Sequence, residues 1–150
     1  MKKNYHILVH KADDNSAKII DVRNIILATK KKEIDEYSVD SNYDNKVNII
    51  IDTLDDEDCF IVNETVDKIY SLINKTDVET AFVRLHFNED NELMVINTSY
   101  IDACHIDEDG DNKVNISNNE LDITQIFINE NPEKVYDIIQ TTIVDLNKTA

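Results

Sequence analysis

Closely spaced acidic side chains are the residues of this sequence best placed to do chemistry. The segment IDEDGDNKV (106–114) has aspartates at relative positions 1, 3 and 5 of a calcium-loop pattern, namely Asp107, Asp109 and Asp111. Asn112 occupies the position at which such a loop bends through glycine, and Asn118 replaces the bidentate glutamate at position 12. Because this ligand set is incomplete, we expect an acidic hairpin turn, which also contains Glu108, and no metal site.

A second acidic run, DDED, occupies residues 55–58. It consists of Asp55, Asp56, Glu57 and Asp58, and Cys59 follows it. No histidine lies at metal-ligand spacing from these carboxylates, so an exposed turn between strands is expected rather than a metal cluster. The sequence therefore predicts neither a metal ion nor another cofactor.

Groups suited to acid–base or nucleophilic catalysis are few. His10 and His86 lie on the polar side of alternating strand patterns, and neither has a neighbouring nucleophile. Cys104 and His105 are adjacent, and adjacent strand residues point to opposite faces, so they do not form a thiolate–imidazole pair. Cys59 and Cys104 lack CxxC spacing and are expected to be reduced, half-buried thiols. We predict no catalytic residues, with an enzyme assembled from sequence-distant groups as the alternative.

The hexapeptide DNKVNI occurs at 44–49 and again at 111–116, and its flanks repeat with it. HILVHKADDNSAKIIDVRNI (6–25) superposes without a gap on FVRLHFNEDNELMVINTSYI (82–101). After each hexapeptide the chain also repeats the pattern N-E-x-x-[D/E]-K-[I/V]-Y. Three blocks repeated in the same order indicate an internal duplication.

This repetition predicts a first unit at 5–75 and a second unit at 81–146. A unit of about 70 residues is near the lower limit for burying its own core, so the two units are expected to pack together. The first unit contains a polar insertion at 30–43 that begins with three lysines. We expect this insertion to be a mobile or peripheral connection. Its apolar residues are Ile34, Tyr37, Val39 and Tyr43.

Hydrophobic periodicity predicts the same elements in both units. In the second unit, AFVRLHF and LMVIN flank a polar turn as one hairpin, and SYIDACHI and KVNIS flank Asp-Gly as another. DITQIFI supplies a fifth strand, and an amphipathic helix follows, capped by Asn131 with Pro132 in its first turn. The corresponding helix of the first unit is capped by Thr65. The predicted fold is α+β: two repeated units, each of four or five short antiparallel strands, as a small barrel or curled sheet, closed by a C-terminal helix.

Composition excludes several classes of protein. A hydrophobic fraction of 41% is adequate for a core, but a single glycine leaves little material for phosphate-cradling loops. No apolar stretch approaches the roughly 18 residues needed to span a bilayer, and the N-terminus lacks the apolar segment of a signal peptide. We expect a cytoplasmic protein with no membrane partner.

Charge is the strongest functional signal. The chain has 31 acidic and 15 basic residues, for a net charge of -16. Residues 1–75 hold 15 acids and 11 bases (net -4), whereas residues 76–150 hold 16 acids and 4 bases (net -12). Such a surface attracts a basic partner and repels nucleic acid. We therefore expect a basic protein surface as the partner and no direct nucleic-acid binding; an acidic surface that only maintains solubility is the alternative.

The order of elements is similar to that of the small SwrD/FlbD-type domain of bacterial flagellar motility, present here as a tandem pair. In the second unit the resemblance is carried by Asn97, Ile101, Glu130, Glu133 and Val135. In the first unit it is carried by Ile25, Glu64, Asp67 and Ile69, with Asp21 at the place of Asn97. The resemblance implies a small β-rich fold without catalytic residues.

Three functional hypotheses follow. The first is a non-enzymatic acidic protein-binding module, of the kind phages and mobile elements encode as inhibitors, which mimics DNA and occupies a basic nucleic-acid-binding surface through residues 107–111 and 55–58. The second is a flagellar adaptor. The third is a small ligand-binding or enzymatic domain that uses the interface between the units. A homodimer is left open as a further form of partnership.

Overall fold

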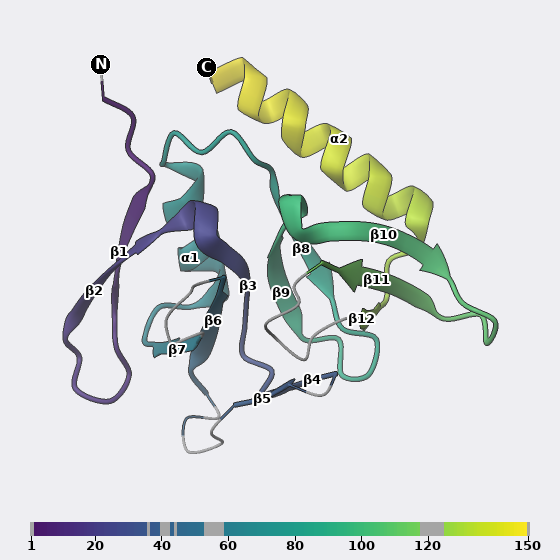
Figure 1. Ribbon diagram of the computed structural model, residues 1–150, viewed down its shortest axis with the longest axis horizontal. Coiled ribbons are helices and arrows are strands. Elements are labelled where there is room, and N and C mark those ends of the chain that lie inside the picture. The colour runs from purple at the N-terminus through teal and green to yellow at the C-terminus, as the bar shows by residue number, and fades with distance from the viewer. Residues whose placement is uncertain are drawn as a thin grey trace.

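Antiparallel strands and two helices form a mixed α+β structure. A computed structural model describes residues 2–35, 37–39, 43, 45–52, 59–117 and 125–149 (Figure 1). The elements up to residue 75 are β1 (His6–His10), β2 (Ala17–Asp21), η1 (Val22–Asn24), β3 (Ile25–Thr29), β4 (Glu33–Ile34), β5 (Tyr37–Ser38), β6 (Val47–Ile51), β7 (Cys59–Val62) and α1 (Val66–Asn74). The later elements are β8 (Phe82–His86), β9 (Leu93–Asn97), η3 (Thr98–Tyr100), β10 (Ile101–Ile106), β11 (Asn112–Ile116), β12 (Gln125–Ile128) and α2 (Pro132–Thr149).

A five-stranded sheet in the order β7-β6-β3-β9-β8 lies at the centre and contains strands from both halves of the chain. The pairs β7–β6, β6–β3 and β9–β8 each join strands that lie near one another in the sequence. The fourth pair, β3–β9, joins strands from different halves of the chain. In that antiparallel pairing Leu27 faces Ile96, Ala28 faces Val95 and Thr29 faces Met94. The β3–β9 junction therefore joins the two halves of the chain into one sheet.

Continuous apolar runs identify the strands inside this sheet. All five residues of β3 are buried, and four of five in β6 and in β9 are buried. Strands that alternate between apolar and polar residues cover a core with one face, whereas continuous apolar strands are buried on both. Here one face contacts β1, β2 and α1 through a first core cluster that includes Ile49 and Val95. The other face contacts β11, β12 and α2 through a second core cluster that includes Leu27 and Ile96.

The remaining strands form smaller open sheets. The β1–β2 ribbon and the β10-β11-β12 sheet flank the central sheet, and β4 pairs with β5. Within the described residues no closed barrel forms, so the barrel version of the predicted fold is wrong. The two predicted hairpins of the second half are confirmed as β8–β9 and β10–β11, and the predicted fifth strand is confirmed as β12.

Both helices begin where the cap residues predict. The Thr65 hydroxyl accepts a hydrogen bond from the Lys68 N–H at 3.1 Å, and Asn131 Oδ1 accepts one from the Lys134 N–H at 2.8 Å. These bonds satisfy amide groups that the first helical turn leaves without partners. Within the described part of the chain, no helix combines the length and apolar character needed to cross a membrane.

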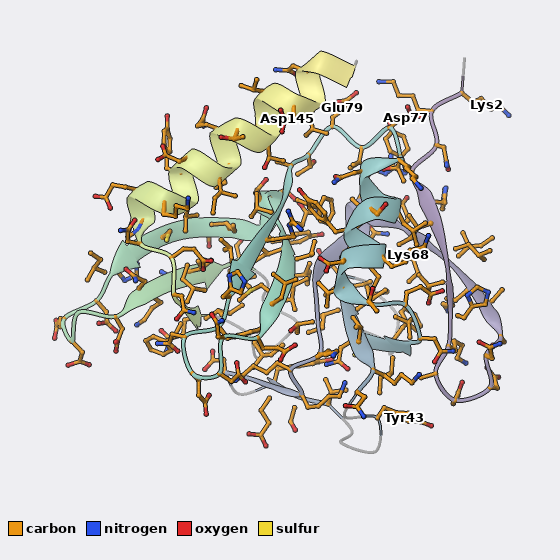
Figure 2. All side chains as sticks on the ribbon, turned by 180° about the vertical axis from the view of Figure 1, so that it is seen from behind. Lys2, Tyr43, Lys68, Asp77, Glu79 and Asp145 are labelled. Carbon is orange, nitrogen blue, oxygen red and sulfur yellow. The ribbon has the colours of Figure 1, made fainter. Side chains whose placement is uncertain are left out.

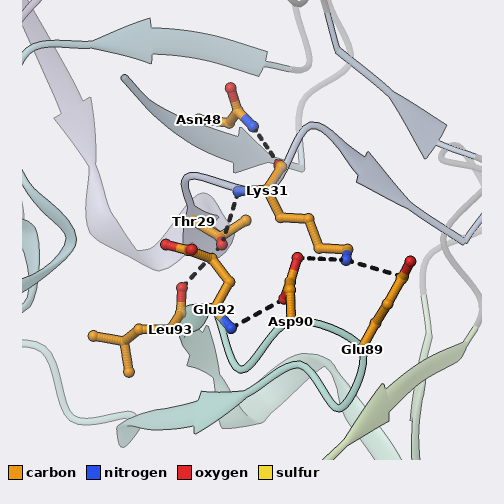
Figure 3. Close-up of polar contacts among 7 residues, drawn as sticks. All are labelled: Thr29, Lys31, Asn48, Glu89, Asp90, Glu92 and Leu93. Carbon is orange, nitrogen blue, oxygen red and sulfur yellow. Dashed lines mark hydrogen bonds and ion pairs between the residues drawn. The ribbon is translucent and has the colours of Figure 1, made fainter. Parts of the chain in front are cut away.

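A group of polar contacts next to the β3–β9 junction links the start of the insertion to the second half of the chain (Figure 3). Lys31 Nζ lies 3.2 Å from Glu89 Oε2 and 3.0 Å from Asp90 Oδ2, with only 15% of its side chain exposed. Burial alone would lower the pKa of Lys31, but its hydrogen bonds to Asp90 and Glu89 outweigh burial and raise it. Asn48 Nδ2 donates to the Lys31 carbonyl at 2.7 Å, so the start of the insertion is held in place.

The expectation that segment 30–43 is a peripheral connection is wrong at Ile34 and Tyr37, which contact the core. Ile34 in β4 is 1% exposed and belongs to the second core cluster, and Tyr37 packs against the same cluster. This burial could not be predicted, because an isolated apolar residue in a polar segment has no periodicity to interpret. Residues 36, 40–42 and 44 lie outside the described residues.

Replacing Ile34 tests this burial. We expect Ile34→Ala to lower the free energy of unfolding by about 2–5 kcal/mol, because it removes buried methylene groups and leaves a cavity. Ile143→Ala is the matched control, since Ile143 is 39% exposed on α2. Urea denaturation followed by circular dichroism measures both. Equal, small losses for the two variants would mean that the insertion is peripheral after all.

Candidate functional site

The acidic segment 107–111 forms the turn of the β10–β11 hairpin, as the sequence predicts. Asp107 Oδ1 accepts hydrogen bonds from the N–H groups of Asp109 and Asp111, each at 2.9 Å. The Asp107 carbonyl accepts from the Gly110 N–H at 3.0 Å, and Gly110 has a φ of 85°. Only glycine adopts this conformation without strain, so the single glycine of the chain shapes this turn.

Electrostatics keep Asp107 ionised within the turn. Backbone hydrogen bonds, first that of Asp111, lower the pKa of Asp107, and Lys113 Nζ lies 3.8 Å from its Oδ2. The side chains of Glu108, Asp109 and Asp111 are exposed. One carboxylate therefore holds the loop while its neighbours face the solvent.

The turn lies at one end of the molecule, where the β10–β11 hairpin extends beyond the rest of the structure (Figure 1). One ligand atom each from Asp107, Asp109 and Asp111 falls within 4.8 Å of the others. These three are the residues that a cation would use, but Asp107 Oδ1 already accepts two N–H groups. The other predicted acidic run, 55–58, and Asn118 lie outside the described residues.

A groove of about 720 Å³ lies between α1 and α2, with β8 at its base. Figure 2 shows Lys68 on α1 and Asp145 on α2, the helices that bound it. Arg84 crosses the groove: its guanidinium lies 4.8 Å from the centre of the Tyr70 ring and 3.6 Å from Asp67 Oδ1. Lys134 also lines it, so two of the four basic residues after position 75 are found here.

Two histidine–glutamate pairs occur at positions that correspond in the superposed sequence segments. His10 Nδ1 lies 2.7 Å from Glu64 Oε2, and His86 Nδ1 lies 2.7 Å from Glu130 Oε2. In each pair the other carboxylate oxygen accepts the histidine backbone N–H, at 2.9 and 3.0 Å. The glutamate side chains are only 12% exposed. These pairs therefore fasten the strand before each ribbon turn to the start of each helix.

Sequence reasoning placed the two histidines on strand surfaces but missed their partners. The signal was available, because Glu64 and Glu130 stand at the same place of the repeated N-E motif. Cys59 and Cys104 are both half-buried, as predicted. Cys104 packs against the second core cluster, where burial raises the pKa of its thiol, while His105 is exposed. Their opposite orientation agrees with the prediction that they do not pair.

A comparison of this chain with known protein families, with curated proteins and with solved structures finds no match. The similarity to the SwrD/FlbD-type domain therefore stays a prediction from the residues that carry it.

The Glu64 carboxylate should contribute a pH-dependent part of the stability. Burial would raise its pKa, but hydrogen bonds from His10 outweigh burial and lower it below the ordinary 4.5. A lowered carboxyl pKa stabilises the fold above the ordinary value, and this contribution disappears as the pH falls through the folded-state pKa. We expect Glu64→Ala to cost about 1–3 kcal/mol at neutral pH, because it leaves a backbone N–H without its acceptor.

Urea denaturation of the wild type and Glu64→Ala over a pH series measures this difference. The gap in unfolding free energy should be constant above pH 5 or so and shrink at lower pH. Glu130→Ala is the matched variant in the second unit, with a similar cost expected at neutral pH. A gap that is independent of pH down to strong acid would show that the carboxylate charge is irrelevant.

Proposed function

We propose that this protein is a non-enzymatic acidic binding module that occupies a basic, nucleic-acid-binding surface of another protein. The observation that carries the proposal is the β10–β11 turn, where three exposed carboxylates stand on a hairpin that extends from the rest of the structure. Nucleic-acid-binding surfaces recognise closely spaced negative charge on phosphates. A row of fixed carboxylates offers the same attraction, as in inhibitors that phages and mobile elements encode.

Preorganisation supports this role for the turn. The backbone of residues 107–111 is held by the Asp107 hydrogen bonds and by Gly110, so binding requires no further ordering of this backbone. A rigid display lowers the entropy cost of binding. The net charge of -12 after residue 75 adds a long-range field that increases the encounter rate.

We also propose that the chain consists of two copies of one unit. Several geometric features recur at positions that the sequence superposition pairs. Asn15 and Asn91 both have a φ of 59°. Their side-chain oxygens accept hydrogen bonds from Asn63 and Asn129, respectively. The isolated bridges Lys11↔Val62 and Phe87↔Ile128, and the register shifts in β3 and β10, also correspond. Together with the two histidine–glutamate pairs, these matches support a duplication.

The groove between α1 and α2 favours a second candidate, a small ligand-binding domain that uses the interface between the units. Arg84 and Lys134 supply positive charge within the more acidic half, and four carboxylates line the same groove: Asp67, Glu130, Asp137 and Asp145. Guanidinium and ammonium groups recognise carboxylates and phosphates through charge-assisted hydrogen bonds. The ligand class proposed for these two cations is therefore a small anion. The flagellar adaptor role stays a prediction from the sequence resemblance.

Thermal-shift measurements with inorganic phosphate and small dicarboxylates test the groove. If the second candidate is right, one of these anions raises the melting temperature of the wild type. An Arg84→Ala/Lys134→Ala variant should lose that shift, because the anion then lacks its cationic partners. A melting temperature that no anion in the panel changes would contradict the ligand-binding candidate.

Neutralising the turn tests the first candidate. We expect a variant with Asn or Gln at Asp107, Glu108, Asp109 and Asp111 to fold nearly as well as the wild type. Asp107→Asn keeps a side-chain oxygen that can accept the N–H groups of Asp109 and Asp111. The other three charges are exposed and contribute little to stability. Its binding to basic nucleic-acid-binding proteins should weaken and lose part of its salt dependence. Proteins retained from a host lysate on the immobilised chain at low salt, and displaced by added duplex DNA, provide the measurement.

The control is the same neutralisation of Asp55, Asp56, Glu57 and Asp58, where the smaller net charge of residues 1–75 predicts a weaker effect. Equal effects of the two variants would mean that net charge alone drives capture. Calcium titration gives a competing result. Micromolar calcium binding that the 107–111 variant abolishes would identify the turn as a metal site.

A further inference from the structure

Among the residues that the structure describes, β2 in the first half of the chain and β10 in the second half each have one edge without a strand partner. Among the described residues β2 pairs only with β1, and β10 pairs only with β11. The sequence superposition places β10 where the first unit has β3, and places β2 where the second unit has β9. The two unpaired edges are therefore the counterparts of the two strands that pair at the β3–β9 junction.

We propose that β10 of one copy pairs with β2 of a second copy, in the antiparallel arrangement of the β3–β9 junction. Transferring that register places Ala103 opposite Ile20, Cys104 opposite Ile19 and His105 opposite Lys18 of the second copy. Figure 1 shows β2 and β10 at well-separated margins of the molecule, so one chain cannot make this contact with itself. The inference rests on the two-unit proposal and does not require a basic partner bound at the acidic turn.

Exposed apolar side chains support the pairing. Ile19 is 67% exposed, whereas Val95 at the corresponding position of β9 is fully buried. Leu8, which lies opposite Ile19 in the β1–β2 ribbon, is 51% exposed. An exposed sheet edge with apolar side chains is a template for pairing with another chain. Val95 is thus buried in β9, which pairs with β3, whereas its counterpart Ile19 is exposed in β2, whose edge has no partner among the described residues.

The helices supply a second match. At the internal junction Tyr70 of α1 stacks against Arg84 of β8. The counterpart of Tyr70 is Tyr136 of α2, which is 62% exposed, and the counterpart of Arg84 is Leu8. In the proposed contact Tyr136 therefore covers Leu8 of the second copy, so an aromatic–aliphatic contact replaces the cation–π contact. Together with Ile19, this accounts for three of the exposed large apolar side chains.

Two features oppose the pairing of β10 with β2 of a second copy, and they predict how this association depends on salt. Asn97 Nδ2 donates to the Ile25 carbonyl at 3.0 Å across the internal junction, but Asp21 stands at the corresponding place and cannot donate. At the internal junction Lys31 forms ion pairs with Glu89 and Asp90. At the corresponding place between two copies, Asp107 of one copy would face Asp13 and Asp14 of the other, and these like charges repel. Because salt screens such repulsion, association between copies should strengthen as salt rises. Binding to a basic partner has the opposite salt dependence, so the two proposals can fail separately.

Sedimentation velocity of the full chain, over a range of protein concentrations at low and high salt, tests the association. We expect species larger than the 17.3 kDa monomer at high salt and high concentration. Asp21→Asn should strengthen association roughly two- to tenfold, because the amide restores one buried hydrogen bond. Ile19→Lys and Tyr136→Lys should each abolish it. A chain that stays monomeric throughout, or an Asp21→Asn variant that associates no better, would overturn the proposal.

A disulfide trap tests the register. Ile19→Cys should form an intermolecular disulfide with the native Cys104 under oxidised glutathione, because facing residues of antiparallel strands have the Cα separation that a disulfide needs. Lys18→Cys is the control on the other face of β2 and should link to Cys104 far less. Mass spectrometry identifies the linked residues. A link between two copies of residue 19, or equal yields for both variants, would contradict the head-to-tail arrangement.

Discussion

Pairing between β3 and β9 is the contact on which the rest of the structure depends. It joins two small sets of strands into one sheet whose central strands are buried on both faces. Thr29 and Asn97 are buried polar side chains at this junction, and each donates across it, to the carbonyls of Leu93 and Ile25. Buried polar groups are costly unless they are bonded, so these bonds make one register far more favourable than a slipped one.

Local features of this fold could be predicted from the sequence because local chemistry determines them. Asp-Gly sets the β10–β11 turn, and Thr65 and Asn131 set the helix starts. The choice of β9 as the partner of β3 could not be predicted, because any exposed strand edge satisfies backbone hydrogen bonds equally well. The continuous apolar run IILA in β3 did carry part of this information, since a strand apolar on both sides must be covered on both.

In the candidate site, too, the features set by local sequence could be predicted and those that join distant segments could not. The acidic turn was predictable because its residues are contiguous and its geometry follows from one glycine and one capping aspartate. The groove between α1 and α2 was not, because Tyr70, Arg84 and Lys134 come from three elements that only the β3–β9 junction brings together. Glu64 and Glu130, the partners of His10 and His86, were predictable only in part. They are distant in sequence, yet the superposition of the units pairs Glu64 with Glu130 as it pairs the histidines.

Acidic charge connects the two proposed interactions. Edge strands need protection from indiscriminate pairing, and proline, bulges or charge can provide it. The β2 and β10 edges contain no proline, and the register shift in β10 has a counterpart in β3, which still pairs with β9. Repulsion between two chains of net charge -16 is therefore their main protection. A basic protein bound at residues 107–111 would neutralise part of that charge next to β10 and so favour pairing of the edges. By thermodynamic linkage, paired copies would in turn bind the basic partner more tightly, since the coupling acts equally in both directions.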